Sequence, residues 1–270
     1  MPGLLIVNAD DFGASLAVNE AVVLARREGV LTSASLMVVG EASDDAAVIA
    51  RDDPELAVGL HVVVSHLPDP VRAGFALSFS HAARARARAS IARQFEAFID
   101  MGLDLSHVDG HQHLHAHPAV LPFIARLAEQ YGANGIRVPC EPLLQGLRID
   151  RTRPTGQLAL SLGQAYLRRA CSRCLRKSSL ATPDRTIGGL MSGRMSTDYV
   201  IRMLNTVQAG SVEVYFHPCV EHAHPYGPNP GDLRALTDPA LARYVREFAW
   251  ELTTYAGLRA AREVETSDRG

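Results

Sequence analysis

Several residue types are scarce in this 270-residue sequence, and their scarcity excludes some classes of protein. Four cysteines do not make a disulfide framework in a chain of this length. Cys171 and Cys174 form a C-x-x-C pair, but "LRRACSRCLRK" has a helical pattern, and no second pair accompanies them. We interpret them as neighbours on one helix face and not as zinc ligands. The net charge of −2 gives no general attraction to nucleic acid, so we expect no such partner.

Long hydrophobic runs are also absent. Every apolar run is shorter than the roughly 20 residues that cross a bilayer. The N-terminal "MPGLLIVNADD" has no basic segment before its short apolar run, whereas a signal peptide has one. We therefore expect a cytoplasmic protein. A hydrophobic content of 47% is enough for one large core, and α/β barrels commonly form a single domain of this length.

The Asp-Phe-Gly triplet in "NADDFG" is a feature of protein kinases. In a kinase, a glycine-rich phosphate loop and a strand lysine precede this triplet. Only nine residues precede Asp10 in this sequence, so we expect neither feature. Asp10 and Asp11 must therefore have another role.

Apolar runs and helical patterns alternate along the chain. We predict strands at 3–9, 33–39, 55–64, 105–109, 135–139, 185–190 and 211–217, and a final strand at 257–263. We predict helices at 19–29, 42–52, 81–101, 118–132, 157–177, 196–207 and 239–257. Such an alternation is typical of an α/β fold with a mostly parallel sheet, here a distorted (β/α) barrel. We find no internal repeat, and expect one domain over 1–265 with 266–270 as a flexible tail.

Polar residues follow the predicted strands at their carboxyl ends. They are Asp10, Asp11, His61, Asp109, His111, Arg137 and His217. The carboxyl ends of parallel strands meet on one face of a barrel, where barrel enzymes build their active sites. We therefore expect these side chains to lie together.

The segment "HVDGHQHLHAHP" contains five histidines, which are His107, His111, His113, His115 and His117. In an extended chain, side chains at i and i+2 share a face, so several imidazoles could converge on one metal ion. The alternative is a polar loop, or capping histidines before a helix that starts at Pro118.

Imidazoles and a carboxylate suit zinc and related divalent ions, and an open coordination position suits catalysis. Asp10 and Asp11 would point to opposite sides of a regular strand, so they are not expected to do the same job. One could bind the metal ion while the other acts as general base on a water molecule.

The motifs "IVNADDFG", "GLHVVV", "HVDGHQHLH" and "VYFHP" together resemble the YdjC-like carbohydrate deacetylase family, which includes chitooligosaccharide deacetylases. The resemblance covers most of the chain. The segments "DGHQHLHAHP" and "GIRVPCEP" most resemble the hopanoid-biosynthesis deacetylase branch called HpnK. The resemblance implies a distorted (β/α) barrel that hydrolyses the N-acetyl group of an amino sugar with the help of a metal ion.

The resemblance also implies roles for individual residues. Asp11, His61 and His111 match the family's ligands of one divalent ion, for which Zn²⁺ and Mg²⁺ are both candidates. Asp10 matches the catalytic base, and His217 resembles the histidine that donates a proton to the leaving amine.

Three further residues are expected to orient ligands or bind substrate: Asp109, His113 and Arg137. Asp109 is placed to orient an imidazole through its second nitrogen, as groups next to metal ligands commonly do. The resemblance assigns no firm role to His113, His115 or His117.

Two alternatives remain to a sugar deacetylase. A phosphoesterase could use a similar Asp/His cluster, but it would favour convergent cations, and only Arg137 lies near a strand end. A metal-dependent binding protein without turnover would be favoured by loss of the acid or the base, and Asp10 and His217 are both present.

The expected substrate is N-acetylglucosaminyl hopanoid, with a general chitooligosaccharide substrate as the alternative. The predicted helix 157–177 is basic and carries Leu158, Leu162 and Tyr166 on an apolar face. Such a helix can lie on an anionic membrane, here the inner face of the inner membrane, or can be an ordinary barrel helix with a solvated arginine face. The sequence is compatible with a monomer or an oligomer.

Overall fold

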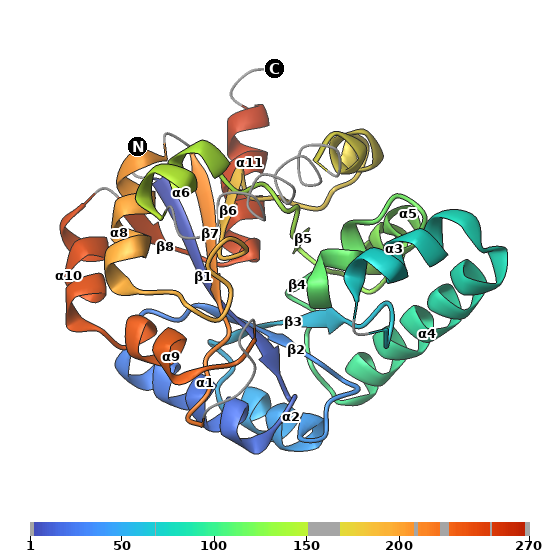
Figure 1. The fold of residues 1–270 in the computed structure, drawn as a ribbon, viewed down its shortest axis with the longest axis horizontal. Helices are drawn as coiled ribbons and strands as arrows, with labels where there is room; N and C mark the ends of the chain where they lie inside the picture. Colours follow the sequence, from blue (N-terminus) through green and yellow to red (C-terminus); the bar gives the residue numbers. More distant parts are fainter. Residues whose placement is uncertain are drawn as a thin grey trace.

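Eight parallel strands form one curved sheet with helices around it (Figure 1). The computed structural model describes residues 3–67, 69–150, 168–207, 210–221, 227–248 and 250–267. The strands are β1 (Gly3–Phe12), β2 (Ser33–Leu36), β3 (Ala57–Val62), β4 (His107–Gly110), β5 (Gly135–Ile136), β6 (Arg185–Ile187), β7 (Ser211–Phe216) and β8 (Trp250–Leu252). They follow the order β5-β4-β3-β2-β1-β7-β6, with β8 also paired to β1. The prediction of a single α/β domain with a distorted barrel is confirmed.

Helices connect the strands and cover the sheet. They are α1 (Leu16–Glu28), α2 (Ser43–Asp52), α3 (Pro70–Phe79), α4 (His81–Asp100), η1 (His111–Ala116, a 3₁₀ helix), α5 (Leu121–Gln130), α6 (Leu143–Ile149), α8 (Thr197–Thr206), α9 (Pro230–Leu236), α10 (Pro239–Glu247) and α11 (Tyr255–Ser267). Ser15, Ser80 and Ser196 cap α1, α4 and α8 by accepting a backbone N–H in the first turn. No described helix is both long and apolar enough to cross a membrane.

The two edges of the sheet come close to each other. Gly135 of β5 forms a parallel bridge with Ala181, which precedes β6. Farther along, the amide of Thr186 donates to the carbonyl of Cys140 at 3.2 Å. This seam between β5 and β6 brings the carboxyl ends of all the strands around one mouth, where a barrel holds its functional groups.

The C-terminal elements differ from the prediction. The expected helix 239–257 is interrupted: α10 ends at Glu247, and β8 then pairs with the first residues of β1. The predicted strand 257–263 is instead part of α11, which continues through Ser267 into the segment expected to be a tail. The helical pattern of the sequence could not reveal that β1 pairs with β8 at its start and with β2 only from Asn8 onward.

Other differences concern starts and connections. Helix α5 begins at Leu121 and not at Pro118, with Pro122 in its first turn. The expected loops contain α3, α6 and α9, and the seven residues of α6 and of α9 are too few to give a strong periodic signal. Of the predicted helix 157–177, residues 168–175 are helical, and residues 151–167, with Leu158, Leu162 and Tyr166, lie outside the described residues.

Candidate active site

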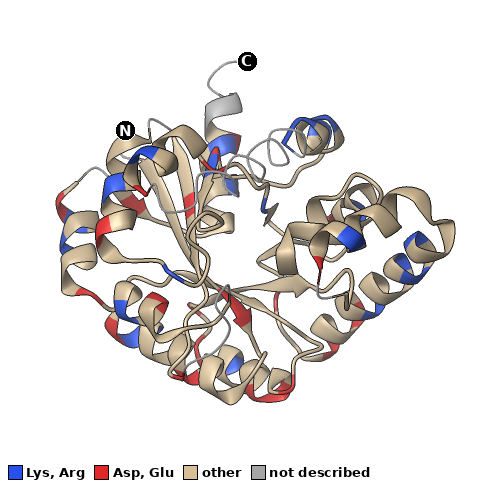
Figure 2. Ribbon diagram, in the orientation of Figure 1, with Lys and Arg blue, Asp and Glu red and all other residues tan. Residues whose placement is uncertain are grey.

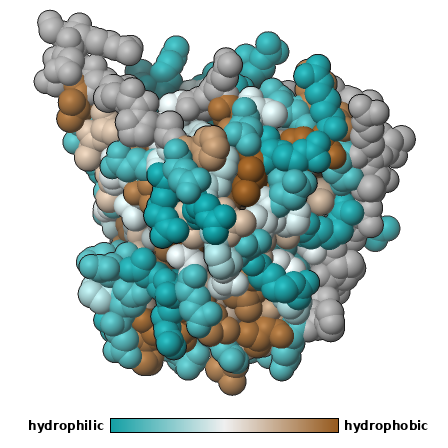
Figure 3. Space-filling model, turned by 90° about the vertical axis from the view of Figure 1, so that its left-hand side faces the viewer, coloured by the Kyte–Doolittle hydropathy of each residue, from teal (hydrophilic) through white to brown (hydrophobic). Residues whose placement is uncertain are grey.

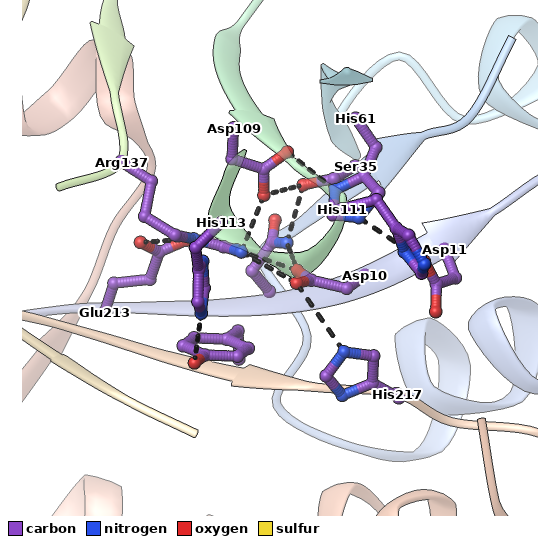
Figure 4. A network of polar contacts seen from close by, with 12 residues as sticks. Asp10, Asp11, Ser35, His61, Asp109, His111, His113, Arg137, Glu213 and His217 are labelled. Atoms are coloured by element: carbon purple, nitrogen blue, oxygen red, sulfur yellow. Dashed lines mark hydrogen bonds and ion pairs between the residues drawn. The ribbon is translucent and has the colours of Figure 1, made fainter. Parts of the chain in front are cut away.

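The polar residues predicted at the strand ends converge in one network (Figure 4). They come from β1, β3, β4, η1 and the residues that follow β5 and β7. The network contains every residue of the predicted set, namely Asp10, Asp11, His61, Asp109, His111, Arg137 and His217. The residues are buried, apart from a partly exposed His111 and a His217 at 13% side-chain exposure.

A β-bulge places Asp10 and Asp11 in the same site. Along β1 and β2, Ala9 pairs with Ala34 but Phe12 pairs with Leu36, so β1 contains one extra residue. Asp11 has φ of 64°, in the left-handed region that non-glycine residues seldom adopt. The strand is therefore not regular here, contrary to the assumption made from the sequence, and the two carboxylates contact different partners within one site.

Arg137 is fully buried and uses all five of its N–H groups on three carboxylates. Its Nη1 and Nη2 donate to the two oxygens of Asp10, each at 2.7 Å. Nη1 also lies 2.8 Å from Asp109, while Nε and Nη2 donate to Glu213 at 3.0 and 2.8 Å. Its guanidinium carbon lies 4.4 Å from the centre of the Tyr215 ring. Because no donor is left over, Arg137 holds carboxylates in place and has no N–H directed at a substrate.

This arrangement sets the charge of the buried carboxylates. Burial alone would raise the pKa of Asp10, but the charge of Arg137 outweighs it, so the pKa lies below its usual value. Burial is likewise outweighed at Asp109, where Arg137 and His61 hold the pKa well below the usual value. Both side chains are therefore anions near neutral pH.

Asp11, His61 and His111 present ligand atoms that all lie within 4.8 Å of one another. Oδ1 of Asp11 is 3.3 Å from Nε2 of His61 and 3.2 Å from Nδ1 of His111. On its other side, Nδ1 of His61 lies 2.8 Å from Oδ1 of Asp109. A hydrogen bond from Nδ1 to Asp109 leaves the Nε2 lone pair facing Asp11, which is the tautomer a metal ligand needs.

The donor set fits a divalent cation. Although burial lowers the pKa of His61, the flanking Asp109 and Asp11 raise it well above its ordinary value. The two carboxylates favour a positive charge at this position. A divalent cation bound beside Asp11 could supply that charge in place of the proton on His61, which would be released. A second group, formed by Asp10, His61 and Asp109, also has close ligand atoms, but Arg137 already occupies both aspartates. The first group is therefore the better metal site.

His217 follows β7 and faces Asp10 across the site. Its Nε2 lies 3.9 Å from Oδ2 of Asp10, and its Nδ1 has no hydrogen-bond partner among the described residues. Its backbone amide donates to Asp232 at 2.8 Å, and Asp232 also accepts from the amide of Met195. Asp232 therefore fixes the position of the chain at His217 while the imidazole remains available at the mouth.

The other histidines of the cluster do not join the metal group. Residues 111–116 form a 3₁₀ helix, with Gln112 and His113 at φ of 56° and 57°, so the expected extended strand with shared faces is wrong. His113 lies 2.9 Å from the Tyr215 hydroxyl, and His115 lies 3.0 Å from the carbonyl of Arg137. Burial lowers the pKa of His113 to about 3 and of His115 to about 4, so both are neutral.

Sequence reasoning missed several members of the network. Glu213 accepts from Arg137 and from the Tyr255 hydroxyl, the latter at 2.8 Å. Ser35 donates to Asp109 at 2.8 Å, and Asn8 donates to Asp10 at 2.8 Å. A charged residue within the apolar strand "SVEVYF" was a usable signal for Glu213, because a buried carboxylate needs a partner. Ser35 and Asn8 gave no comparable signal.

Comparison with known proteins identifies one relative over nearly the whole chain and others over about half of it. A carbohydrate deacetylase of Geobacillus stearothermophilus is 31% identical over 282 residues, which cover 94% of this chain and 98% of that protein. A chitooligosaccharide deacetylase of Salmonella paratyphi B is 38% identical over 170 residues, which cover 56% of this chain and 61% of that protein.

Solved structures share the fold at low sequence identity. An Enterococcus faecalis protein, provisionally named for cellobiose-phosphate cleavage, matches with a TM-score of 0.69 and 20% identity over 96% of this chain and 99% of its own. A family 4 carbohydrate esterase from Streptomyces lividans, in complex with acetate, matches with a TM-score of 0.50 and 11% identity over 93% of this chain and 92% of its own. The YdjC-like protein family profile matches residues 4–247, and the chain therefore belongs to this family.

Proposed function

We propose that this protein is a metal-dependent hydrolase that removes the acetyl group from an N-acetylated amino sugar. The observation that carries the proposal is the position of two separate groups in one site. Asp11, His61 and His111 form a metal-ligand group, and the adjacent Asp10 faces His217 at 3.9 Å. The names of the deacetylases that align with this chain support the same reaction.

The residues would divide the work as follows. A divalent ion held by Asp11, His61 and His111, either Zn²⁺ or Mg²⁺, would supply Lewis acidity to the acetyl carbonyl and to a water molecule. Asp10, an anion fixed by Arg137, accepts the proton of the attacking water. His217 donates a proton to the departing amine nitrogen, which is otherwise a poor leaving group. Asp109 orients His61 through Nδ1.

An amide substrate agrees with the charges better than a phosphate ester does. Three carboxylates, from Asp10, Asp109 and Glu213, share the single guanidinium of Arg137, and a fourth, Asp11, lies in the same site beside His61 and His111. Since all N–H groups of Arg137 are used within the protein, it offers nothing to a phosphate, and the surrounding carboxylates repel one. A neutral acetamido group meets no such repulsion.

The finer proposal is that the amino sugar is the glucosamine head group of N-acetylglucosaminyl hopanoid. It is supported by the resemblance of "DGHQHLHAHP" and "GIRVPCEP" to the hopanoid-biosynthesis branch. The competing substrate is a soluble chitooligosaccharide.

The test is acetate release by purified protein that has been stripped of metal and then reloaded with Zn²⁺ or Mg²⁺. N-acetylglucosaminyl hopanoid and chitobiose serve as parallel substrates. We expect activity only with metal present, and higher kcat/KM on the lipid-linked sugar. No acetate from either substrate at full metal occupancy would contradict the deacetylase, while equal efficiency on both would contradict only the hopanoid assignment.

A further inference from the structure

Helix α3 exposes a stripe of large apolar side chains. Val71, Phe75 and Phe79 recur every four residues and so share one helix face. They are 63%, 63% and 81% exposed, and the two phenylalanine rings stack with centroids 5.9 Å apart. A helix normally turns such a stripe toward the core. Contiguous apolar side chains left in water mark a surface that contacts another apolar phase.

Positive charge predominates around this stripe, although Asp69, the N-cap residue of α3, pairs with Arg72 at 3.6 Å. From Pro70 to Phe95, across α3 and most of α4, the sequence has five arginines and neither Asp nor Glu. A second segment, residues 168–177, has four arginines, one lysine and again no acid. We call these ten residues the basic segment. Figure 2 shows both groups of basic residues on the same half of the molecule.

Both elements contact η1, which begins with the candidate metal ligand His111. On one side, Ser78 of α3 lies 3.2 Å from Nε2 of His117, the C-cap residue that follows η1. On the other side, Sγ of Cys171 in the basic segment donates to the carbonyl of Ala116 at 3.7 Å. The fully buried Cys171 anchors the inner face of the basic segment, while Arg168, Arg169 and Arg173 are exposed. Helix α3 and the basic segment therefore flank the C-terminal end of η1, the element whose first residue is the candidate metal ligand His111.

We propose that α3 and the basic segment dock on an anionic phospholipid membrane. Phe75 and Phe79 enter the boundary between head groups and acyl chains, and the arginines contact lipid phosphates. The charge of the surface formed by α3 and the basic segment argues against a second copy of this chain as its binding partner. A two-fold contact between identical patches would set arginines mostly against arginines, with Asp69 already paired to Arg72, which is unfavourable.

Docking would set the mouth of the barrel beside the bilayer. The part of the inference that concerns substrate access rests on the proposed function, because it assumes that the site accepts a lipid-linked sugar. The docking itself depends only on the surface. The side of the molecule seen in Figure 3, which includes α10, carries many hydrophilic side chains with hydrophobic ones among them.

The test is co-sedimentation of the full chain with vesicles of phosphatidylcholine alone or with 30 mol% (about one third) phosphatidylglycerol. We expect binding only to the anionic vesicles, and release by salt. The double substitution Phe75→Ser and Phe79→Ser should weaken binding by roughly tenfold or more. Replacing Arg169 and Arg173 by Gln should weaken it by about fivefold per residue if each cation reaches the surface.

A matched control replaces two exposed apolar residues elsewhere, Val48 of α2 and Leu144 of α6, by Ser. This control should bind vesicles like the wild type, and the melting temperatures of all variants show whether they are folded. Failure of the wild type to bind anionic vesicles, or unchanged binding by the folded phenylalanine variant, would overturn the proposal. The proposal would also be overturned if the wild type were a dimer and only the phenylalanine variant were a monomer, because the stripe would then be the dimer interface.

The readouts separate docking from catalysis. Turnover of soluble chitobiose by the phenylalanine variant should equal that of the wild type, since neither side chain belongs to the catalytic network. Vesicle binding by a protein that deacetylates nothing would support docking and count against the proposed function alone.

Discussion

Arg137 determines the charge balance of the candidate site. Its guanidinium is wholly buried and contacts Asp10, Asp109 and Glu213 with ion-pair distances of 2.7 to 2.8 Å. Removing one partner of a buried ion pair is costly because the remaining charges keep no compensation. The planar fork also fixes both oxygens of Asp10, which a point charge such as lysine cannot do.

We therefore expect Arg137→Met to destabilise the protein by about 3–5 kcal/mol or to prevent folding. Denaturant unfolding measures the loss. The control is Arg26→Met, which breaks a partly exposed pair with Asp53 at 2.8 Å and should cost about 1 kcal/mol or less. Equal losses in the two variants would show that the buried network does not depend on this cation.

A second prediction distinguishes the proposed roles of the adjacent Asp10 and Asp11. Asp10→Asn should reduce acetate release by about 10²–10⁴-fold, because it removes the proposed general base, while metal binding is retained. Asp11→Asn should reduce metal affinity itself, because Asp11 contacts both candidate ligand histidines. Metal content after dialysis and single-turnover acetate release measure the two effects. The division of roles is wrong if Asp10→Asn loses metal or Asp11→Asn keeps full affinity.

At the scale of elements, the sequence predicts which strand ends carry the polar residues of the site. It does not predict the backbone conformation at those ends. Alternating apolar runs and terminal polar residues correctly brought Asp10, His61 and His217 to one mouth. The bulge at Asp11 could not be predicted, because it depends on pairing with β2 rather than on local propensity. The 3₁₀ turn of η1 was missed for a related reason. His115 is buried through a contact with the carbonyl of Arg137, 22 residues away in the chain.

The connection from β6 to α8 is held by a carboxyl group that the sequence did not single out. Glu141 accepts from the backbone amides of Gly188 at 3.2 Å and Leu190 at 2.8 Å. Burial outweighs these hydrogen bonds and raises the pKa of Glu141 from 4.5 to about 7. The folded protein therefore binds this proton more tightly than the unfolded chain does.

This shift predicts a specific pH dependence of stability. With a raised pKa, the contribution of Glu141 is full below about pH 4.5 and is lost as the pH rises through about 7, by at most about 3 kcal/mol. We expect the melting temperature of the wild type to fall relative to that of Glu141→Gln between pH 5 and pH 8. The glutamine variant is the control for every other titrating group. If the melting temperatures of the wild type and of Glu141→Gln changed in parallel between pH 5 and pH 8, Glu141 would not titrate in this range.

At the scale of the whole molecule, the site depends on closure of the sheet at the seam. β1 is central, with β7 on one side and β8 followed by β2 on the other, and it carries both aspartates. The opposite side of the ring has less pairing: one isolated bridge joins Gly135 of β5 to Ala181, and Thr186 of β6 exchanges hydrogen bonds with the backbone of Cys140. Tyr255 of α11 fills this region and donates its hydroxyl to Glu213, which in turn contacts Arg137.

Gly135 is the position at which this closure can be tested. A Cβ atom there would meet the ring of Tyr255 and lie 2.5 Å from the carbonyl oxygen of Ala181, so the seam would have to open. We expect Gly135→Ala to cost about 1–3 kcal/mol in denaturant unfolding, and to lower activity because Tyr255 can no longer hold Glu213. Gly74→Ala in α3 is the matched control. Its nearest heavy atom is 4.0 Å away, and alanine should stabilise a helix interior by about 0.5–1 kcal/mol. If Gly135→Ala were as stable and active as Gly74→Ala, the network around Arg137 would not need a closed seam.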